Sequence, residues 1–411
     1  MAGRTIYLDN NATTPVASEV LEAMMPYFKG EFFNPGSTYD QARGPRDAVE
    51  TARERVARML GCGSKSEVIF TASATEGNNA AIWGTLRANA ERRHVVTTAV
   101  EHPAVLEVAR EAARTGWRVT FLPVDSAGRL DAAALVRAIE KDTAIVSVMY
   151  ANNETGVVFP VEDLARLVKE VDPAVVFHTD ATQVAGKLPI DLSGRLRGVD
   201  ILTLSGHKLH APKGVGAMFV RRGTRWRPWV IGGHQERGRR AGTENVPYAV
   251  GLGRACELAT THLLEAVRLR RVQQRLERDV LARIPFSRVN GQGAERLPNT
   301  TSFAFDYVEG EAILFSLNER GICASSGSAC TSGSLDPSHV LKAMGVPFTA
   351  AHGSLRISTS AYTADADVDA LLESLPGIIE GLRRGSPYWD VARNAPKEGA
   401  DVFVAGKYRE K

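Results

Sequence analysis

The chain has 411 residues, of which 44% are hydrophobic and 24% charged, as is usual for a globular protein of two or three domains. Its 50 lysines and arginines nearly balance 47 aspartates and glutamates, so charge gives no reason to expect a nucleic acid or an anionic membrane as partner. Four scattered cysteines exclude a disulfide framework and favour a reducing compartment. No apolar run resembles a signal peptide or a membrane span, so we expect a soluble, cytoplasmic protein.

From Val68 to about Val220, short β-rich runs alternate with segments of helical period, which predicts an α/β fold with a mostly parallel central sheet flanked by helices. The expected strands are 67–73, 94–100, 118–124, 143–153, 175–182, 200–207 and 215–220, and the expected helices include 76–90, 103–115 and 161–171. Ligands of such sheets collect beyond the carboxyl ends of the strands. Polar residues at these ends are therefore the first candidates for a functional site.

A long helical segment over 255–284 follows a Gly- and Arg-rich stretch and is expected to join two domains. We expect a large domain at 15–262 and a smaller α+β domain made of 1–14 and 263–411. The smaller domain contains a Ser/Gly-rich loop with Cys330 and ends in a polar tail expected on the surface.

The segment LSGHKLHAPKGVGA places Lys208 directly after an expected strand, beside Ser205, Gly206 and His207. A buried lysine at a sheet edge can be held partly neutral, as a Schiff-base lysine requires. A surface lysine in a Gly-rich turn explains this motif equally well. The choice between the two depends on the companion residues.

Asp180 lies at the carboxyl end of another expected strand, with Gln183 three residues later. A carboxylate there could pair with the protonated pyridine nitrogen of pyridoxal phosphate and keep the ring an electron sink. Gln183 could then hydrogen bond to the ring oxygen. A capping or turn aspartate is the commoner role of a lone Asp in this position.

Two further strand ends pass into helices. Thr75 and Glu76 lie near the start of one expected helix, where backbone N–H groups and the helix dipole favour a phosphate. His102 precedes a proline at the start of the next, where its imidazole could lie on a cofactor ring and carry protons. Taken alone, the first is also a plain capping sequence and the second also a structural histidine.

Asn152 and Asn153 end a further strand and offer amides to a ring or a substrate. Arg356 lies in an expected strand of the second domain. Arginine is the usual residue for bidentate capture of an α-carboxylate, with a surface salt bridge as the alternative.

Cys330 stands among serines, glycines and other small residues. Such a loop cannot pack a core and is expected to move, which suits a thiolate that reaches a substrate and then presents its cargo elsewhere. Cys323 and Cys330 could instead form a metal or redox pair, but no CxxC spacing supports this interpretation. We expect Cys62 and Cys256 to be passive.

Taken together, these segments resemble the cysteine desulfurases of the NifS/IscS type, in the class V aminotransferase group of fold-type I pyridoxal-phosphate enzymes. The resemblance covers nearly the whole chain and rests on YLDNNATTP, ATEGNN, EHPAV, NNETGV, DATQ, SGHKLHAPKGVG, GGHQERGRRAGTEN, SSGSACTSGSLDPSHVLKAMG and LRIS. GGHQERGRRAGTEN and GICASSGSACTSGS are closer to the nitrogen-fixation branch than to the housekeeping branch.

The resemblance implies an enzyme that removes sulfur from L-cysteine, releases L-alanine and holds the sulfur as a persulfide on Cys330. Lys208 would carry the cofactor as a Schiff base, His102 would stack on its ring, and Arg356 with Asn153 would bind the substrate. The implied cofactor-binding residues are Thr75, Glu76, Asn153, Asp180, Gln183, Ser205 and His207, with Thr243 reaching the phosphate of the neighbouring subunit of a homodimer.

The implied partner is an iron–sulfur scaffold protein, and in relatives the C-terminal end helps to dock it. No resident metal is implied, although Cys330 could transiently ligate a cluster on that scaffold.

Three other functions remain to be weighed. An aminotransferase or a selenocysteine lyase could use the same scaffold, but transamination has no use for a thiol on a Ser/Gly-rich loop. A non-catalytic binding protein would not need Lys208, Asp180 and His102. A nucleotide-phosphate enzyme would carry a GxxxxGK[ST] or a strand-linked GxGxxG signature, and the chain has neither.

Overall fold

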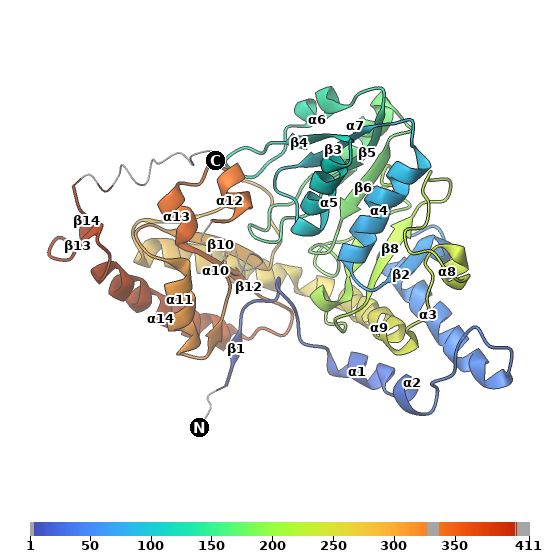
Figure 1. Ribbon diagram of the computed structural model, residues 1–411. Helices are drawn as coiled ribbons and strands as arrows, with labels where there is room; N and C mark the ends of the chain where they lie inside the picture. The colour runs from blue at the N-terminus through green and yellow to red at the C-terminus, as the bar shows by residue number, and fades with distance from the viewer. Residues whose placement is uncertain (1–3, 327–336, 399, 401–411) are drawn as a thin grey trace.

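The large part of the molecule is built on a seven-stranded sheet with strand order β2-β8-β7-β6-β5-β3-β4 (Figure 1). The computed structural model describes residues 4–326, 337–398 and 400. The strands are β2 Val68–Thr71, β3 His94–Thr98, β4 Arg118–Leu122, β5 Thr143–Ser147, β6 Val176–Asp180, β7 Ile201–Ser205 and β8 Gly216–Val220. Only β8 runs antiparallel to its neighbours, so the other six strands end at one edge of the sheet. The predicted mostly parallel sheet is confirmed.

Hydrophobic side chains cover both faces of this sheet, because neighbouring residues of a strand point to opposite faces. Val95, Ile145 and Ile201 are fully buried in one cluster, and Val96, Val146 and Leu202 in another. The first cluster includes residues of α4 Ala74–Ala88 and α5 Pro103–Arg114, and the second residues of α3 Arg43–Met59, α7 Val161–Val171 and α9 Val246–His262. The shorter elements of this part are α1 Ser18–Met24, α2 Pro26–Lys29, α6 Ala132–Ala138, α8 Gln235–Gly238, η1 Asp40–Ala42, η2 Lys65–Glu67 and η3 Gly206–Lys208.

The C-terminal part is a smaller α+β unit on one side of the large sheet (Figure 1). Its antiparallel sheet has the order β12-β10-β9, from β9 Ser287–Val289, β10 Thr300–Phe305 and β12 Ser354–Ser358. The remaining elements are α10 Ala266–Arg283, α11 Gly310–Asn318, α12 His339–Ala343, α13 Phe348–His352, α14 Asp365–Arg384, and the strand pairs β1 Ile6–Tyr7 with β11 Ile322–Cys323 and β13 Trp389–Asp390 with β14 Ala395–Pro396.

The N-terminal strand β1 belongs with the smaller unit. Leu8 is fully buried in the same cluster as Ile322 and Leu355, whereas Ala17 packs into the core of the large sheet. This packing supports our proposal of domains at 15–262 and at 1–14 with 263–411.

The long helical segment expected over 255–284 is interrupted. α9 ends at His262, and a 3-10 turn, η4 Leu263–Glu265, leads into α10. Thr260, Thr261 and His262, which precede the turn, all have low helix propensity.

The described start of the tail lies at the surface as expected, except for Trp389. Trp389 is 3% exposed, and its ring centroid lies 5.6 Å from that of Phe286 and 5.7 Å from that of Tyr307. The large apolar indole therefore fastens the start of the tail to the smaller unit. A search of the described helices finds none long and apolar enough to cross a membrane.

Candidate functional site

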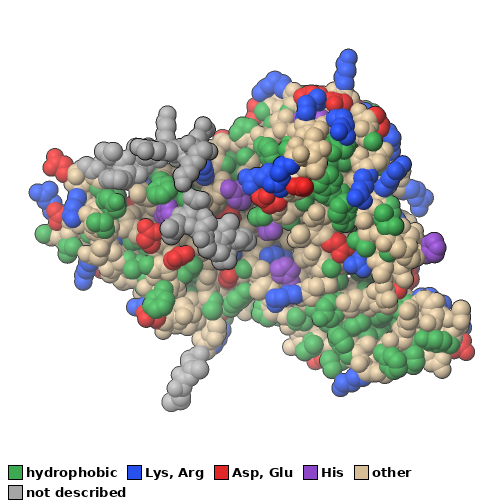
Figure 2. All heavy atoms as spheres, in the orientation of Figure 1, with side chains coloured by type: hydrophobic (Ala, Val, Ile, Leu, Met, Phe, Trp, Pro, Cys, Tyr) green, Lys and Arg blue, Asp and Glu red, His purple; other side chains and the backbone are tan. Residues whose placement is uncertain are grey.

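A cavity of about 360 Å³ lies where the strands of the large sheet end. Figure 2 shows histidine side chains gathered on one face, in the hollow between the two units. The cavity is lined by Asn11, Ala12, Ser73, Ala74, Thr75, Asn78, His102, Ala104, Met149, Ala151, Asn153, Asp180, Thr182, Gln183, Ser205, His207, Lys208 and Arg356. Eight candidates from the large unit and Arg356 from the smaller one therefore meet here, from segments far apart in the sequence.

Lys208 reaches the cavity from η3, directly after strand β7. Its Nζ donates hydrogen bonds of 2.6 Å and 2.7 Å to the backbone carbonyls of Asn11 and Ala12. The neighbouring His207 has a pKa lowered to about 4, because it is desolvated and lies close to the Lys208 charge. The N-terminal segment thus holds the amine at the cavity wall.

Asp180 ends strand β6 and is 6% exposed. Its Oδ2 accepts a hydrogen bond of 2.7 Å from the Asn78 amide, and its Oδ1 accepts one of 2.9 Å from the Thr182 backbone N–H. Within the described part of the chain it forms no salt bridge with a lysine, arginine or histidine. Asp180 is therefore a carboxylate in the buried cavity wall whose two hydrogen-bond donors are both uncharged.

His102 caps the N-terminus of α5, and its Nδ1 accepts a hydrogen bond of 3.1 Å from the Ala104 backbone N–H. Desolvation lowers its pKa, and the charge of Lys208 lowers it further against the opposing effect of Asp180. Because Nδ1 accepts, the proton of the neutral ring must be on Nε2. His102 is thus a neutral imidazole with one donor nitrogen.

The N-terminus of α4 opens onto the same cavity through Ser73, Ala74 and Thr75. Ser73 is the N-cap, and its Oγ accepts from the Glu76 backbone N–H at 3.2 Å. The first backbone N–H groups of a 15-residue helix, together with the helix dipole, favour an anionic group at this end.

Arg356 enters from strand β12, and its guanidinium is 4% exposed. It donates to the Asp9 carboxylate at 2.7 Å and to the backbone carbonyl of Asn153 at 3.1 Å. Its Nε is buried with no partner in the described structure. A buried donor without an acceptor is costly, which suits a group that receives an anion.

Three candidates do not line the cavity of their own chain. The Asn152 amide instead donates to the Val100 carbonyl at 3.0 Å. The Glu76 carboxylate accepts from Arg240 at 2.8 Å and from the Ala72 backbone N–H at 2.8 Å.

The third, Thr243, is exposed and lines a separate cavity of about 250 Å³ with Glu236 and Arg240. A fourth candidate, Cys330, lies outside the described residues.

The loop that carries Thr243 is fixed to the large unit by a buried ion pair. Arg53 donates to both carboxylate oxygens of Glu236, at 2.6 Å and 2.8 Å, and the Phe70 backbone N–H donates to Glu236 at 3.0 Å. Glu236 and Arg237 have φ values of 47° and 60°, which non-glycine residues rarely adopt. The ion pair offsets this backbone strain and holds the loop in one conformation.

Comparison with known proteins assigns the family. Residues 6–371 match the family aminotransferase class-V. The chain belongs to this family. The class-V chain is 54% identical over 384 residues to "Cysteine desulfurase" of Nostoc sp., covering 93% of this chain and 95% of that protein. It is 50% identical over 404 residues to "Cysteine desulfurase NifS" of Azotobacter vinelandii, covering 98% and 99%.

Solved structures agree with the assignment to class V. A structure titled "NIFS-LIKE PROTEIN" has a TM-score of 0.85 and 37% identity, covering 92% of this chain and all of that one. A second, "SspA in complex with cysteine", has a TM-score of 0.76 and 35% identity, covering 88% and 100%. The class-V cysteine desulfurases depend on pyridoxal phosphate.

The cavity of this class-V protein fits that cofactor. Lys208 supplies an amine for the aldehyde, and Asp180 a carboxylate without a cation for a protonated ring nitrogen. The α4 N-terminus suits the phosphate. The cavity volume of about 360 Å³ falls in the ordinary range for small-molecule sites. We therefore keep the predicted roles of these residues as a proposal.

The described residues on both sides of Cys330 are attached to the cavity wall or to residues next to it in the sequence. The Ser325 backbone pairs with that of Arg356, at 3.3 Å and 2.6 Å. After the cysteine, Ser338 donates to the buried carboxylate of Glu154, and His339 Nε2 lies 2.9 Å from the Glu101 carbonyl oxygen. The class-V chain therefore enters and leaves the Cys330 segment at this site.

The other three cysteines lie elsewhere. Burial raises the pKa of Cys62 to about 12 and also raises that of Cys256, so neither forms a thiolate readily. Cys323 lies partly buried in β11.

Sequence reasoning missed three buried residues of the site. Asn78 holds Asp180, and Glu101 and Glu154 are carboxyls whose pKa values burial raises to about 8 and about 7. Each lies within a segment already singled out, namely ATEGNN, EHPAV or NNETGV, one or two positions from a residue that was chosen instead. Nothing in those segments shows which of two neighbouring side chains points inward.

Proposed function

We propose that this protein is a cysteine desulfurase that removes sulfur from L-cysteine, releases L-alanine and holds the sulfur as a persulfide on Cys330. The observation that carries the proposal is the meeting of Lys208, Asp180, His102 and Arg356 at one cavity. The described flanks of Cys330 are attached to Arg356 and to Glu154, the sequence neighbour of the lining residue Asn153. The relatives named cysteine desulfurase, 50% and 54% identical, support the same reaction.

Arg356 holds the substrate by its carboxylate, using the guanidinium that Asp9 and the Asn153 carbonyl already orient. Lys208 lines the same cavity and, once its amine is released from the cofactor, would be the general base for the Cα proton. Pyridoxal phosphate, when bound, supplies the electron sink for the negative charge left on the substrate carbon. Asp180 would keep the ring nitrogen of the bound cofactor protonated, so that it can accept this charge.

The sulfur transfer needs a thiolate on Cys330. A bond forms between Cys330 Sγ and the substrate sulfur while the bond between that sulfur and the substrate Cβ breaks. The electron pair of the broken bond stays with the carbon skeleton, which takes up protons and leaves as alanine. His102, neutral with its proton on Nε2, is placed to donate one of them.

We also propose that the enzyme is a cytoplasmic homodimer in which Thr243 of each subunit completes the site of the other. Thr243 is exposed on a loop that Glu236 holds in place, and it contributes nothing to the cavity of its own chain. These properties suit a residue that reaches across an interface.

We propose further that the persulfide is passed to an iron–sulfur scaffold protein, as part of cluster assembly for nitrogen fixation. The similarity to the NifS protein of Azotobacter vinelandii supports this role.

The test of the reaction compares the wild type with Cys330→Ala, both loaded with pyridoxal phosphate. Alanine and sulfide released from L-cysteine with a reductant are measured, and the visible spectrum is recorded. We expect both proteins to show the cofactor band and only the wild type to release alanine and sulfide. Full activity of Cys330→Ala would mean that the persulfide mechanism is wrong and that a different lyase, or an aminotransferase, takes its place.

A further inference from the structure

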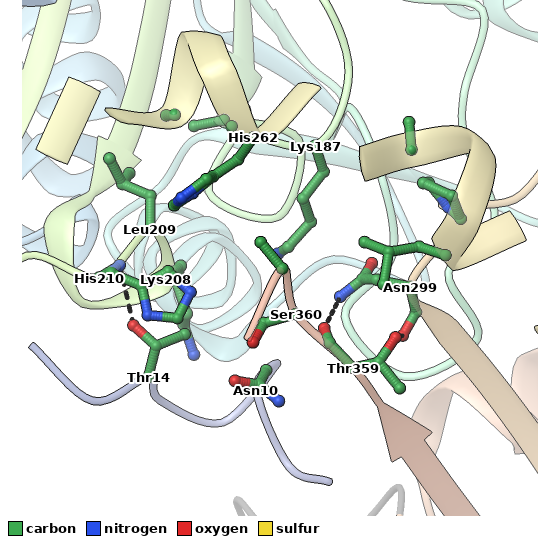
Figure 3. A pocket seen from close by; sticks show the side chains of 17 residues that line it. Asn10, Thr14, Lys187, Lys208, Leu209, His210, His262, Asn299, Thr359 and Ser360 are labelled. Atoms are coloured by element: carbon green, nitrogen blue, oxygen red, sulfur yellow. Dashed lines mark hydrogen bonds between the residues drawn. The ribbon is translucent and has the colours of Figure 1, made fainter. Parts of the chain in front are cut away.

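A second, smaller cavity of about 40 Å³ is also lined by Lys208. Figure 3 shows the side chain of Lys187 pointing into it, in the company of His210, His262 and Asn299. Lys187 was not among the residues that sequence reasoning selected, and the reaction described above does not use it. A lysine in such a place calls for a physical reason.

Lys187 is only partly exposed and forms no salt bridge with a carboxylate of the described residues. Desolvation, together with the charges of Lys208 and Arg356, lowers its pKa to about 7. The other titratable groups that interact with it are His207 and His210. Placing an amine among cations and histidines is unfavourable, so another interaction must compensate.

That interaction is with Gln183, four residues earlier. Lys187 Nζ donates a hydrogen bond of 2.9 Å to Gln183 Oε1. The other end of the same amide, Nε2, donates one of 3.0 Å to the Asn11 carbonyl. The Lys208 amine donates to this same carbonyl at 2.6 Å.

The two partners of Gln183 fix its amide in one orientation. While the Lys187 amine is protonated it has only donors, so the amide atom facing it must then be the oxygen. A backbone carbonyl only accepts, so the atom facing Asn11 must be the NH2 group. Both partners demand the same arrangement, in which the amide NH2 lies on the side of Lys208.

We propose that Lys187 is a positioning residue, which orients the Gln183 amide so that its NH2 group serves as a hydrogen-bond donor in the cofactor cavity. Gln183 is 5% exposed and lines that cavity together with Lys208. This inference rests on the proposed function in one respect, namely that the cavity binds pyridoxal phosphate with its ring oxygen near Gln183.

The orientation has a spectroscopic consequence. A donor that faces the anionic ring oxygen stabilises the negative charge of that oxygen. The oxygen then binds the proton of the adjacent Lys208 Schiff base less strongly. Without Lys187 only the Asn11 carbonyl holds the amide, so the flipped orientation, in which the amide oxygen faces the anion, becomes less unfavourable. Removing Lys187 should therefore raise the pH at which the Schiff base loses its proton.

The experiment is a pH titration of the visible band of the cofactor-loaded protein. We expect Lys187→Met to raise the midpoint by about 0.5–1 pH unit, the size set by one net hydrogen bond. Lys187→Arg keeps the donor and should titrate like the wild type. Lys213→Met removes an exposed lysine that acts on His207 but does not contact Gln183, and should leave the midpoint unchanged.

A double-mutant cycle separates orientation from simple charge. If Lys187 acts through the amide, Gln183→Ala alone should reproduce the shift, and adding Lys187→Met should shift it no further. An equal shift from Lys187→Met in the Gln183→Ala background would overturn the inference, because the effect would then be one of charge. Unchanged midpoints in Lys187→Met and Gln183→Ala would overturn it as well. Absence of the band in the wild type would instead refute the proposed function.

Discussion

Asn78 donates a hydrogen bond of 2.7 Å to the Asp180 carboxylate, and both side chains are buried in the large unit. Asn78 is itself fixed from behind, because Thr203 Oγ1 donates to its amide oxygen at 2.5 Å. His178, with a pKa lowered to about 4 by burial, lies 3.3 Å from that hydroxyl. Asp180 is thus held by a neutral network that leaves its charge available to a ligand.

Replacing Asn78 by leucine should reduce kcat for alanine release about tenfold or more. The change removes a hydrogen bond to a charged group, worth about 1.5–3 kcal/mol, and leaves Asp180 less firmly oriented. Asn79→Ala is the matched control, because the Asn79 amide donates to the Thr75 carbonyl and not to Asp180. Steady-state rates with L-cysteine within twofold of wild type for Asn78→Leu would contradict this role.

Glu101→Gln should make the protein more stable at high pH. Burial raises the pKa of Glu101 from 4.5 to about 8, so between these values the folded protein keeps a proton that the unfolded chain has lost. The Glu101 contribution to stability therefore falls as pH rises from about 4.5 to 8. Its Oε1 accepts from Thr98 and Met149, which glutamine preserves, and its Oε2 has no partner in the described structure.

We expect the free energy of unfolding at pH 9 to be about 1–3 kcal/mol higher in Glu101→Gln than in the wild type, and the difference to shrink at pH 5. Urea denaturation at both pH values measures it. Glu107→Gln, in the exposed part of α5, is the control and should show no such dependence. A constant difference at both pH values would argue against a protonated Glu101.

Arg356→Lys should raise KM for L-cysteine at least about tenfold, because lysine cannot form a bidentate pair with a carboxylate. The lost orientation toward Asp9 and the Asn153 carbonyl adds to this effect. Arg288→Lys changes an arginine that is paired with Asp306 away from the cavity, and its KM should remain that of the wild type. Equal KM values for both variants would show that Arg356 does not bind the substrate.

Mixing two variants of little or no activity tests whether Thr243 of one subunit completes the site of the other. Lys208→Ala should abolish activity and Thr243→Ala should lower it strongly, but a mixed dimer has one site with both residues intact. Refolding the two variants together should therefore restore activity well above that of either alone. If no activity returns while mixed dimers are present, Thr243 acts within its own subunit or not at all.

Much of the fold follows from the sequence. Five of the strands, β2, β3, β5, β6 and β7, end in a polar residue, so both the sheet and the edge that carries Asp180 and Lys208 could be predicted. The end of β8 is the expected one, whereas the other six strands end two to six residues earlier than expected. A side chain can turn the backbone before an expected strand end. Asn152 Oδ1, for example, accepts from the N–H groups of Glu154 and Thr155, and the chain folds back there.

The contacts behind the site could not be predicted. Asn78 meets Asp180, and Ser338 meets Glu154, across more than 100 residues of sequence. Such contacts depend on how α4 and α12 pack, which no local pattern encodes. The family resemblance also pointed to Glu76 as a cofactor ligand, whereas its carboxylate pairs with Arg240.

The most direct test of the central claim is the intact mass of the cofactor-loaded protein after one brief exposure to L-cysteine without a reductant. We predict a mass increase of one sulfur atom, located on the peptide that contains Cys330 and removed by a thiol reductant. Cys330→Ala should show no such increase while it keeps the cofactor band. Alanine release without any sulfur added to Cys330, or the same increase in Cys330→Ala, would contradict the proposed persulfide mechanism.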